Sequence, residues 1–160
     1  MGNSIRLALY HEQYDQDLND ISLKGEQIQF TAMPADVIEE AIQNLDKDPI
    51  VILHEEKPVG FFILHKNSEY AQEKDACHTI LVRALSISVE HQGNGYAKET
   101  MKALPKFVRQ LHPEINEIIL AVNEGNITAQ QLYLKVDFLD RGVRKMGIHG
   151  LQLILHHRIT

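Results

Sequence analysis

Residues 85–111 show two successive hydrophobic patterns around which the rest of the chain is organised. In the first, Leu85, Ile87 and Val89 alternate with polar residues, and this period of two predicts a strand with one apolar and one polar face. In the second, apolar residues recur every three or four positions, which predicts an amphipathic helix that ends before Pro113. The helical positions are Ala97, Met101, Leu104, Val108 and Leu111.

The same two periods predict the other elements. Apolar or alternating runs predict strands at 5–9, 50–54, 59–65, 117–122, 138–144 and 151–158, and a further strand from about Thr79 into the central stretch. Helical spacing predicts helices over 13–23, over 33–45 and after the turn at 124–126, whereas the segment 25–31 has no firm assignment. The order is strand, two helices, three strands, helix, strand, helix and two strands, which is a mixed α/β (α+β) pattern.

The composition is that of an ordinary globular chain. Its 160 residues are 44% hydrophobic and 24% charged, so we expect one domain, residues 1–160, with a substantial core. No apolar run approaches the ~20 residues of a membrane span, and the N-terminus lacks the basic and apolar regions of a signal peptide. Since the single Cys77 cannot form an internal disulfide, we expect a cytoplasmic protein.

Charge and motifs exclude several classes of function. The net charge of -6 argues against a nucleic-acid partner, because phosphate binding needs clustered Lys and Arg. The nine histidines contain no His-x-x-x-His pair, and adjacent His156 and His157 would point to opposite faces of a strand, so we expect no metal site. The absence of a Gly-x-Ser-x-Gly elbow argues against a serine hydrolase of that type.

The turn between the central strand and its helix has the chemistry of an anion site. The first N–H groups of a helix lack intrahelical partners, and the helix dipole adds partial positive charge there. Gly93 and Gly95 permit positive φ values and the close approach of a phosphate. The glycines alone are also compatible with a plain tight turn, and neither the dinucleotide-binding pattern nor a P-loop is present.

Two segments resemble motifs of the GNAT superfamily of N-acetyltransferases. The first is similar to the family's Gln/Arg-x-x-Gly-x-Gly/Ala pyrophosphate loop and consists of Gln92, Gly93, Asn94, Gly95, Tyr96 and Ala97. The second, residues 126–138, is similar to the family's Asn-x-x-Ala-x-x-Leu-Tyr-x-Lys-x-Gly-Phe helix. Val89 stands where many members have proline. Asp137 stands where glycine is usual, which requires Asp137 to adopt the left-handed conformation.

The resemblance implies a fold and an activity. It implies a GNAT-type domain in which a central, twisted, mixed and mostly antiparallel sheet of about six or seven strands is flanked by about four helices. The fourth and fifth strands of such a sheet are parallel and splay apart, and the gap receives the pantetheine arm of acetyl-CoA. The implied reaction is transfer of an acetyl group from acetyl-CoA, the cosubstrate, to an amine by direct attack.

The resemblance also implies roles for individual residues. A backbone N–H near Ile87 or Val89 meets the thioester carbonyl, and Tyr133 occupies the general-acid position. Asn126 is a candidate ligand of the pantetheine amide, although its simplest role is helix N-cap. Backbone amides hold the diphosphate, and they belong to Gln92, Gly93, Asn94, Gly95, Tyr96, Ala97 and Lys98.

The acceptor side carries weaker signals. Candidates for the general base are Glu90, Glu26 and Ser86, and a water chain is the alternative. We expect a small-molecule primary amine, such as a polyamine, as the acceptor, and a protein or peptide N-terminus as the next choice. The competing function is an acetyl-CoA-binding sensor or regulatory module without turnover, which would have no use for the Tyr133 hydroxyl. We expect either a monomer or a homodimer.

Overall fold

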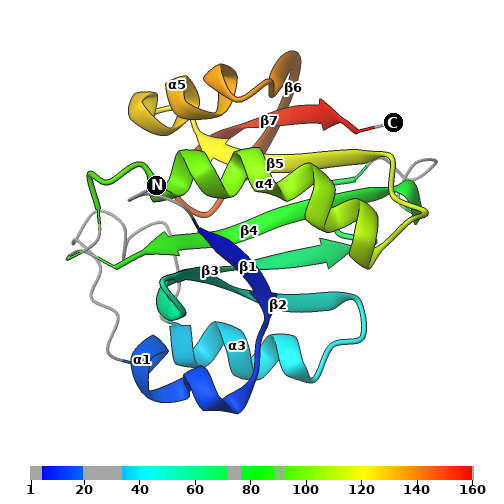
Figure 1. Cartoon of the computed structure of the whole chain (residues 1–160). Helices are drawn as coiled ribbons and strands as arrows, with labels where there is room; N and C mark the ends of the chain where they lie inside the picture. Colours follow the sequence, from blue (N-terminus) through cyan, green and yellow to red (C-terminus); the bar gives the residue numbers. More distant parts are fainter. Residues whose placement is uncertain (1–4, 20–33, 72–76, 89, 91, 160) are drawn as a thin grey trace.

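The structure is a computed structural model that describes residues 5–19, 34–71, 77–88, 90 and 92–159. Seven strands form one sheet in the order β1-β2-β3-β4-β5-β7-β6 (Figure 1). All neighbouring strands are antiparallel except β4 and β5, which are parallel. The strands are β1 (Arg6–Leu9), β2 (Lys47–His54), β3 (Lys57–Lys66), β4 (Thr79–Ile87), β5 (Glu117–Asn123), β6 (Leu139–Gly147) and β7 (Gly150–Arg158).

Helices cover both faces of this sheet (Figure 1). One face carries α1 (Asp15–Asn19), which follows the 3-10 turn η1 (Glu12–Tyr14), and α3 (Pro34–Ile42). The other face carries α4 (Tyr96–Leu111) and α5 (Ile127–Lys135). Among the described residues, no helix has the length and apolar character needed to cross a membrane.

The central strands bury side chains on both faces, because successive residues of a strand point to opposite sides of the sheet. The largest cluster lies towards α4 and α5, and its most buried members include Phe62, Leu64, Ile80, Met101 and Phe138. A second cluster lies towards α1 and α3 and consists of Leu18, Ile38, Ala41, Val51, Leu53, Phe61 and Ile63. A third, smaller cluster of Leu81, Ile119 and Ile154 packs with partly buried residues that include Tyr70 and Ala71.

A β-bulge interrupts the pairing of β3 with β4. The register shifts between Phe61 and Ile63, where β4 contains one extra residue, and Ala84 of β4 adopts a φ of 59°. The two backbones approach closely next to this bulge, because a Cβ on Gly60 would overlap the carbonyl oxygen of Ser86. Position 60 therefore requires glycine.

The predicted fold class and order of elements are confirmed. The sheet is mixed and mostly antiparallel, and the fourth and fifth strands are the parallel pair. Asp137 adopts the left-handed conformation that the sequence required, with a φ of 77°. The predicted helix over 13–23 is η1 followed by α1, and the part of that prediction beyond residue 19 lies outside the described residues.

Two local predictions were wrong. The strand β2 begins at Lys47 and runs through Pro49, where the sequence predicted a break before residue 50. The polar face predicted for the central strand is not exposed to solvent, since Ser86 and Ser88 are only 2% and 3% exposed. The Ser86 hydroxyl can be buried because it donates a 3.0 Å hydrogen bond to the Ala84 carbonyl inside the protein.

Candidate active site

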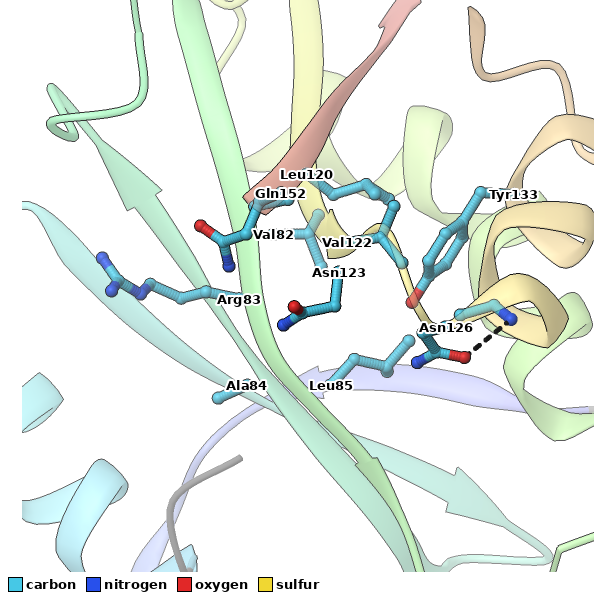
Figure 2. Close-up of a pocket in the computed structure, with 12 residues that line it drawn as sticks. Val82, Arg83, Ala84, Leu85, Leu120, Val122, Asn123, Asn126, Tyr133 and Gln152 are labelled. Carbon is cyan, nitrogen blue, oxygen red and sulfur yellow. Dashed lines mark hydrogen bonds between the residues drawn. The ribbon is translucent and has the colours of Figure 1, made fainter. Parts of the chain in front are cut away.

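A cleft lies where β4 and β5 separate. The parallel pairing of the two strands ends at Val82 and Leu120, and both strands continue beyond this point without pairing to each other. The cleft has a volume of about 150 Å³ and is bordered by the two strands, β7 and α5 (Figure 2). It is lined by Val82, Arg83, Ala84, Leu85, Leu120, Ala121, Val122, Asn123, Asn126, Ala129, Tyr133 and Gln152. The predicted splaying of the parallel strands is therefore confirmed.

Tyr133 on α5 directs its hydroxyl into this cleft (Figure 2). Its ring is partly buried and packs against Phe138, with 6.1 Å between the ring centroids. Burial raises the pKa of the Tyr133 hydroxyl to about 12, so the group is protonated at neutral pH. Within the described part of the chain the hydroxyl has no hydrogen-bond partner, which leaves its proton available to a molecule in the cleft.

Asn126 connects the cleft to the start of α5. Its Oδ1 accepts a hydrogen bond of 3.1 Å from the Ala129 backbone N–H, which is the N-cap interaction that the sequence predicted (Figure 2). Because this bond uses the side-chain oxygen, the amide NH₂ group is left as a donor at the cleft. In this one position, Asn126 can cap α5 through its oxygen and can also bind a pantetheine amide through its NH₂ group.

The turn between β4 and α4 has the backbone conformation that its glycines predict. Gly93 and Gly95 adopt φ values of 83° and 79°, and Gly95 is the N-cap of α4, so no side chain caps the helix at this position. The first N–H groups of α4 are therefore suited to an anionic partner. No described residue lies within 4 Å of a Cβ built on either glycine, so the space beside the turn is open.

The side chains of Gln92 and Tyr96 in this turn contact other parts of the protein. The Gln92 Nε2 donates a 2.8 Å hydrogen bond to the Ile87 carbonyl and ties the turn to the end of β4. Tyr96 is only 6% exposed, and its hydroxyl lies 3.2 Å from Nδ1 of His54. Tyr96 can therefore serve a ligand only through its backbone N–H, whereas the side chain of Lys98 is exposed.

The backbone of Ile87 points its N–H group towards the open edge of β4. The next residue, Ser88, donates its N–H to Val59 across the pair with β3. Because the N–H groups of consecutive strand residues point to opposite edges, the Ile87 N–H faces away from β3. That is the edge from which β5 has separated, so this N–H is a donor candidate for a carbonyl oxygen in the cleft.

The two described candidates for the general base, Ser86 and Glu90, do not line the cleft. Ser86 is buried and donates its hydroxyl to the Ala84 carbonyl over 3.0 Å. Glu90 is exposed and is not one of the described residues that line the cleft. Glu26 and Val89 lie outside the described residues. The described lining contains side-chain amides, a phenol and a guanidinium, but no carboxylate.

Three polar lining residues were not singled out from the sequence. Arg83 interrupts an apolar run in β4, Asn123 ends β5, and Gln152 pairs with Asn123 from β7. A charged residue inside a buried strand is a signal that the sequence does contain. The convergence of the three residues, however, depends on the separation of β4 from β5.

His156 and His157 lie in separate environments on the two faces of β7. The Nδ1 of His156 is 2.7 Å from Oε1 of Glu117, whereas the His157 ring packs edge-on against Phe138 with 5.2 Å between centroids. The two rings are therefore not arranged to share one ion. No group of three or more His, Cys, Asp or Glu residues suited to a metal occurs in the described ranges.

Comparison with known proteins relates this fold and cleft to a family. The model of the "Acetyltransferase (GNAT) family" matches residues 10–138. The chain is 42% identical, over 158 residues, to an uncharacterized N-acetyltransferase of Bacillus subtilis (strain 168), YbbJ, and the match covers 98% of this chain and 99% of that protein.

Solved structures share the fold at low sequence identity. The aminoglycoside acetyltransferase AAC(6')-Ib in complex with coenzyme A and kanamycin matches with a TM-score of 0.75 at 18% identity, covering 97% of this chain and 95% of that one. The spermidine N-acetyltransferase of Vibrio cholerae in complex with CoA and spermine matches with a TM-score of 0.72 at 14% identity, covering 96% and 95%. The solved structures show the shared fold, and the family model and the 42% identical relative show that the chain is an N-acetyltransferase of the GNAT family.

Proposed function

We propose that the protein transfers an acetyl group from acetyl-CoA to the primary amine of a small molecule. The observation that carries this proposal is the Tyr133 hydroxyl, which is protonated, has no partner in the described chain, and points into the cleft. A proton donor at this place would assist the departure of a thiolate. A sensor that only binds acetyl-CoA would not require it.

Acetyl-CoA supplies the activated acetyl group as a thioester, and two features of the chain fit it. The N–H groups at the start of α4 and the open space beside Gly93 and Gly95 suit the diphosphate. The edges of β4 and β5 that do not pair with each other, together with the NH₂ group of Asn126, suit the amides of the pantetheine arm.

In the proposed reaction the protein stabilises charge and moves one proton. The Ile87 N–H donates to the thioester carbonyl oxygen as negative charge develops there, and one such preorganised donor is worth about 3 kcal/mol. The nitrogen of the neutral amine forms the new C–N bond while the C–S bond breaks. Tyr133 donates its proton to the leaving sulfur, and the proton lost from the nitrogen returns to the phenol through solvent. The products are the N-acetylated amine and the CoA thiol.

The acceptor must lose a proton from its ammonium form before it can attack, because only the neutral amine is nucleophilic. Glu90 is exposed beyond the end of β4 and would act through water if it is the base. The described lining of the cleft contains no carboxylate that could take this role directly. A water chain to bulk solvent therefore remains part of the proposal.

Titration calorimetry with acetyl-CoA, followed by an assay of free thiol release, tests this function. The assay uses a panel of primary amines that includes polyamines, amino acids and peptides. We expect binding of acetyl-CoA and thiol release with at least one small-molecule amine. Binding without release by any amine would support the sensor function, and release with peptides alone would move the acceptor class to protein N-termini.

A further inference from the structure

Arg83 borders the cleft and points away from Tyr133 (Figure 2). Its Nη1 donates to Oε1 of Glu69 over 2.9 Å and lies 3.0 Å from Nδ1 of His65. Both contacts use the same nitrogen, so the Nε and Nη2 side of the guanidinium makes no hydrogen bond in the described chain. The Arg83 side chain is 36% exposed and can therefore reach a molecule at the mouth of the cleft.

A second cation lies beside the same aromatic ring. The Cζ of Arg83 is 5.8 Å from the centroid of the Tyr70 ring, and the Nζ of Lys145 is 5.1 Å from it. The Tyr70 hydroxyl donates a 3.0 Å hydrogen bond to Oε1 of Gln152, which itself lines the cleft. Tyr70 thus holds two positive charges next to the cleft.

Among the described residues, the cations Arg83 and Lys145 and the carboxylate of Glu69 lie at this mouth, although the whole chain carries a net charge of -6. Glu69 offsets the charge of Arg83, but its carboxylate is 54% exposed and solvent screens the pair. Lys145 has no ion-pair partner in the described ranges. Since the described lining contains no carboxylate and Glu69 is already paired with Arg83, a polycationic acceptor would meet repulsion from Lys145 here.

We infer that the acceptor amine also carries a carboxylate, which the Nε and Nη2 side of Arg83 binds with Lys145 nearby. This inference rests on the proposed function and narrows its acceptor class to amino-acid-like compounds. A guanidinium presents parallel N–H groups that match the two oxygens of a carboxylate, so the contact fixes the orientation of the acceptor as well as its position. Arg83 is then a specificity-determining residue.

The positive charges also favour the reactive form of the acceptor. A nearby cation disfavours protonation of an amine, because two like charges repel each other. The carboxylate of the acceptor is attracted to Arg83 while its amino group is kept neutral for attack. This arrangement reduces the need for a carboxylate base, which the described lining does not contain.

The test compares pairs of acceptors that differ only in the carboxylate. Suitable pairs are phenylalanine with phenethylamine and lysine with cadaverine, and spermidine is added as a polycation. The purified full chain is assayed for thiol release with saturating acetyl-CoA. We expect the kcat/KM of at least one carboxylate-bearing member to exceed that of its partner by about tenfold or more, as expected for one charge-assisted contact.

Substitutions of Arg83 and Glu69 test whether Arg83 causes the preference for a carboxylate-bearing acceptor. Arg83→Met should lower kcat/KM for the carboxylated acceptor about tenfold to a hundredfold and change it less than about threefold for the decarboxylated partner. Arg83→Lys, which keeps the charge without the planar fork, should give an intermediate loss. Glu69→Gln removes the competing carboxylate and should lower the KM for the carboxylated acceptor, an effect that a purely structural ion pair would not produce.

Arg6→Met is the matched control, because Arg6 also pairs with an exposed carboxylate, that of Glu56, but lies on the edge strand β1. We expect the wild-type acceptor preference in this variant, and thermal unfolding checks that every variant is folded. Equal or higher kcat/KM for the decarboxylated amines or spermidine would overturn the inference and leave the proposed function intact. If acetyl-CoA binds but no amine releases thiol, the inference is tested by the binding of N-acetylphenylalanine, a carboxylate-bearing product, to the complex of the protein with CoA. Failure of that binding overturns the inference as well.

Discussion

The backbone of Gly60 in β3 packs directly against the Ser86 carbonyl of β4, closer than any side chain on residue 60 would permit. A Cβ on Gly60 would also lie 2.9 Å from Cδ1 of Ile87. This contact lies beside the bulge at Ala84 and determines the path of β4 as it leaves β5. The close approach that brings the Ile87 backbone into this position therefore depends on a missing side chain on the neighbouring strand.

Gly60→Ala should destabilise the protein by about 1–3 kcal/mol, the usual cost of overpacking a buried site. Urea unfolding followed by circular dichroism measures this difference. Gly125→Ala is the matched control, because no described residue lies within 4 Å of a Cβ at position 125. If both variants unfold at the same urea concentration, the close packing of β3 against β4 does not contribute to the free energy of unfolding.

Tyr133→Phe should lower kcat about a hundredfold or more, because general acid catalysis typically contributes at least that much. The affinity for acetyl-CoA should change little, since the ring and its packing on Phe138 are kept. Thiol release gives kcat and calorimetry gives the dissociation constant. Tyr10→Phe removes a hydroxyl that bonds to the exposed Asp15 and serves as the control. Unchanged turnover in Tyr133→Phe would remove this residue from the acid role.

Deprotonation of Tyr133 should not lower kcat between neutral and moderately alkaline pH. Burial disfavours the charged phenolate and raises the pKa of Tyr133 to about 12, so the acidic form persists as the pH rises. We expect kcat to remain free of a Tyr133-dependent decline up to about pH 10. A decline near pH 8 to 9 that disappears in Tyr133→Phe would contradict this expectation.

Gly95→Ala should weaken acetyl-CoA binding by more than its effect on stability. Alanine at a φ of 79° costs about 1 kcal/mol of backbone strain, and its Cβ would occupy the open space proposed for the diphosphate. Gly142→Ala is the matched control, because Gly142 has a φ of 86° and similar open space but lies on β6. Calorimetry should show weaker binding for Gly95→Ala only. Equal dissociation constants would show that this turn is not the phosphate site.

His65 should make the protein less stable as the pH falls. Burial, and then the charges of Arg83 and Lys47, lower the pKa of His65, while Glu69 and Asp46 oppose them. In the unfolded chain this pKa is about 6.5, so below that pH the unfolded state binds a proton that the folded state does not. The free energy of unfolding should fall from about pH 7.5 to about pH 5.5, and it should fall less in His65→Asn. Urea unfolding at both pH values measures the difference, and equal falls would contradict it.

Local sequence patterns were sufficient for the order of elements and for the conformation of the turn before α4. Alternation and helical spacing are properties of neighbouring residues, so they predicted the helix from 96 to 111 even though Pro105 lies inside it. Local chemistry also accounts for the conformations of Gly93 and Gly95 and for the N-cap role of Asn126, and the resemblance to the family motif predicted the positive φ of Asp137. Each of these predictions involves contacts within a few residues along the chain.

The tertiary structure decided which residues meet across strands. The serines of the central strand are buried, and the register of β4 against β3 depends on a bulge that no local pattern shows. The environment of Arg83 brings together residues from β3, from the segment after β3, and from the β6–β7 hairpin. The sequence therefore determined the family, the order of its elements and the conformation of the glycine turn before α4. The charge at the mouth of the cleft was decided only by long-range packing, since its members are distant along the chain and have no shared periodicity.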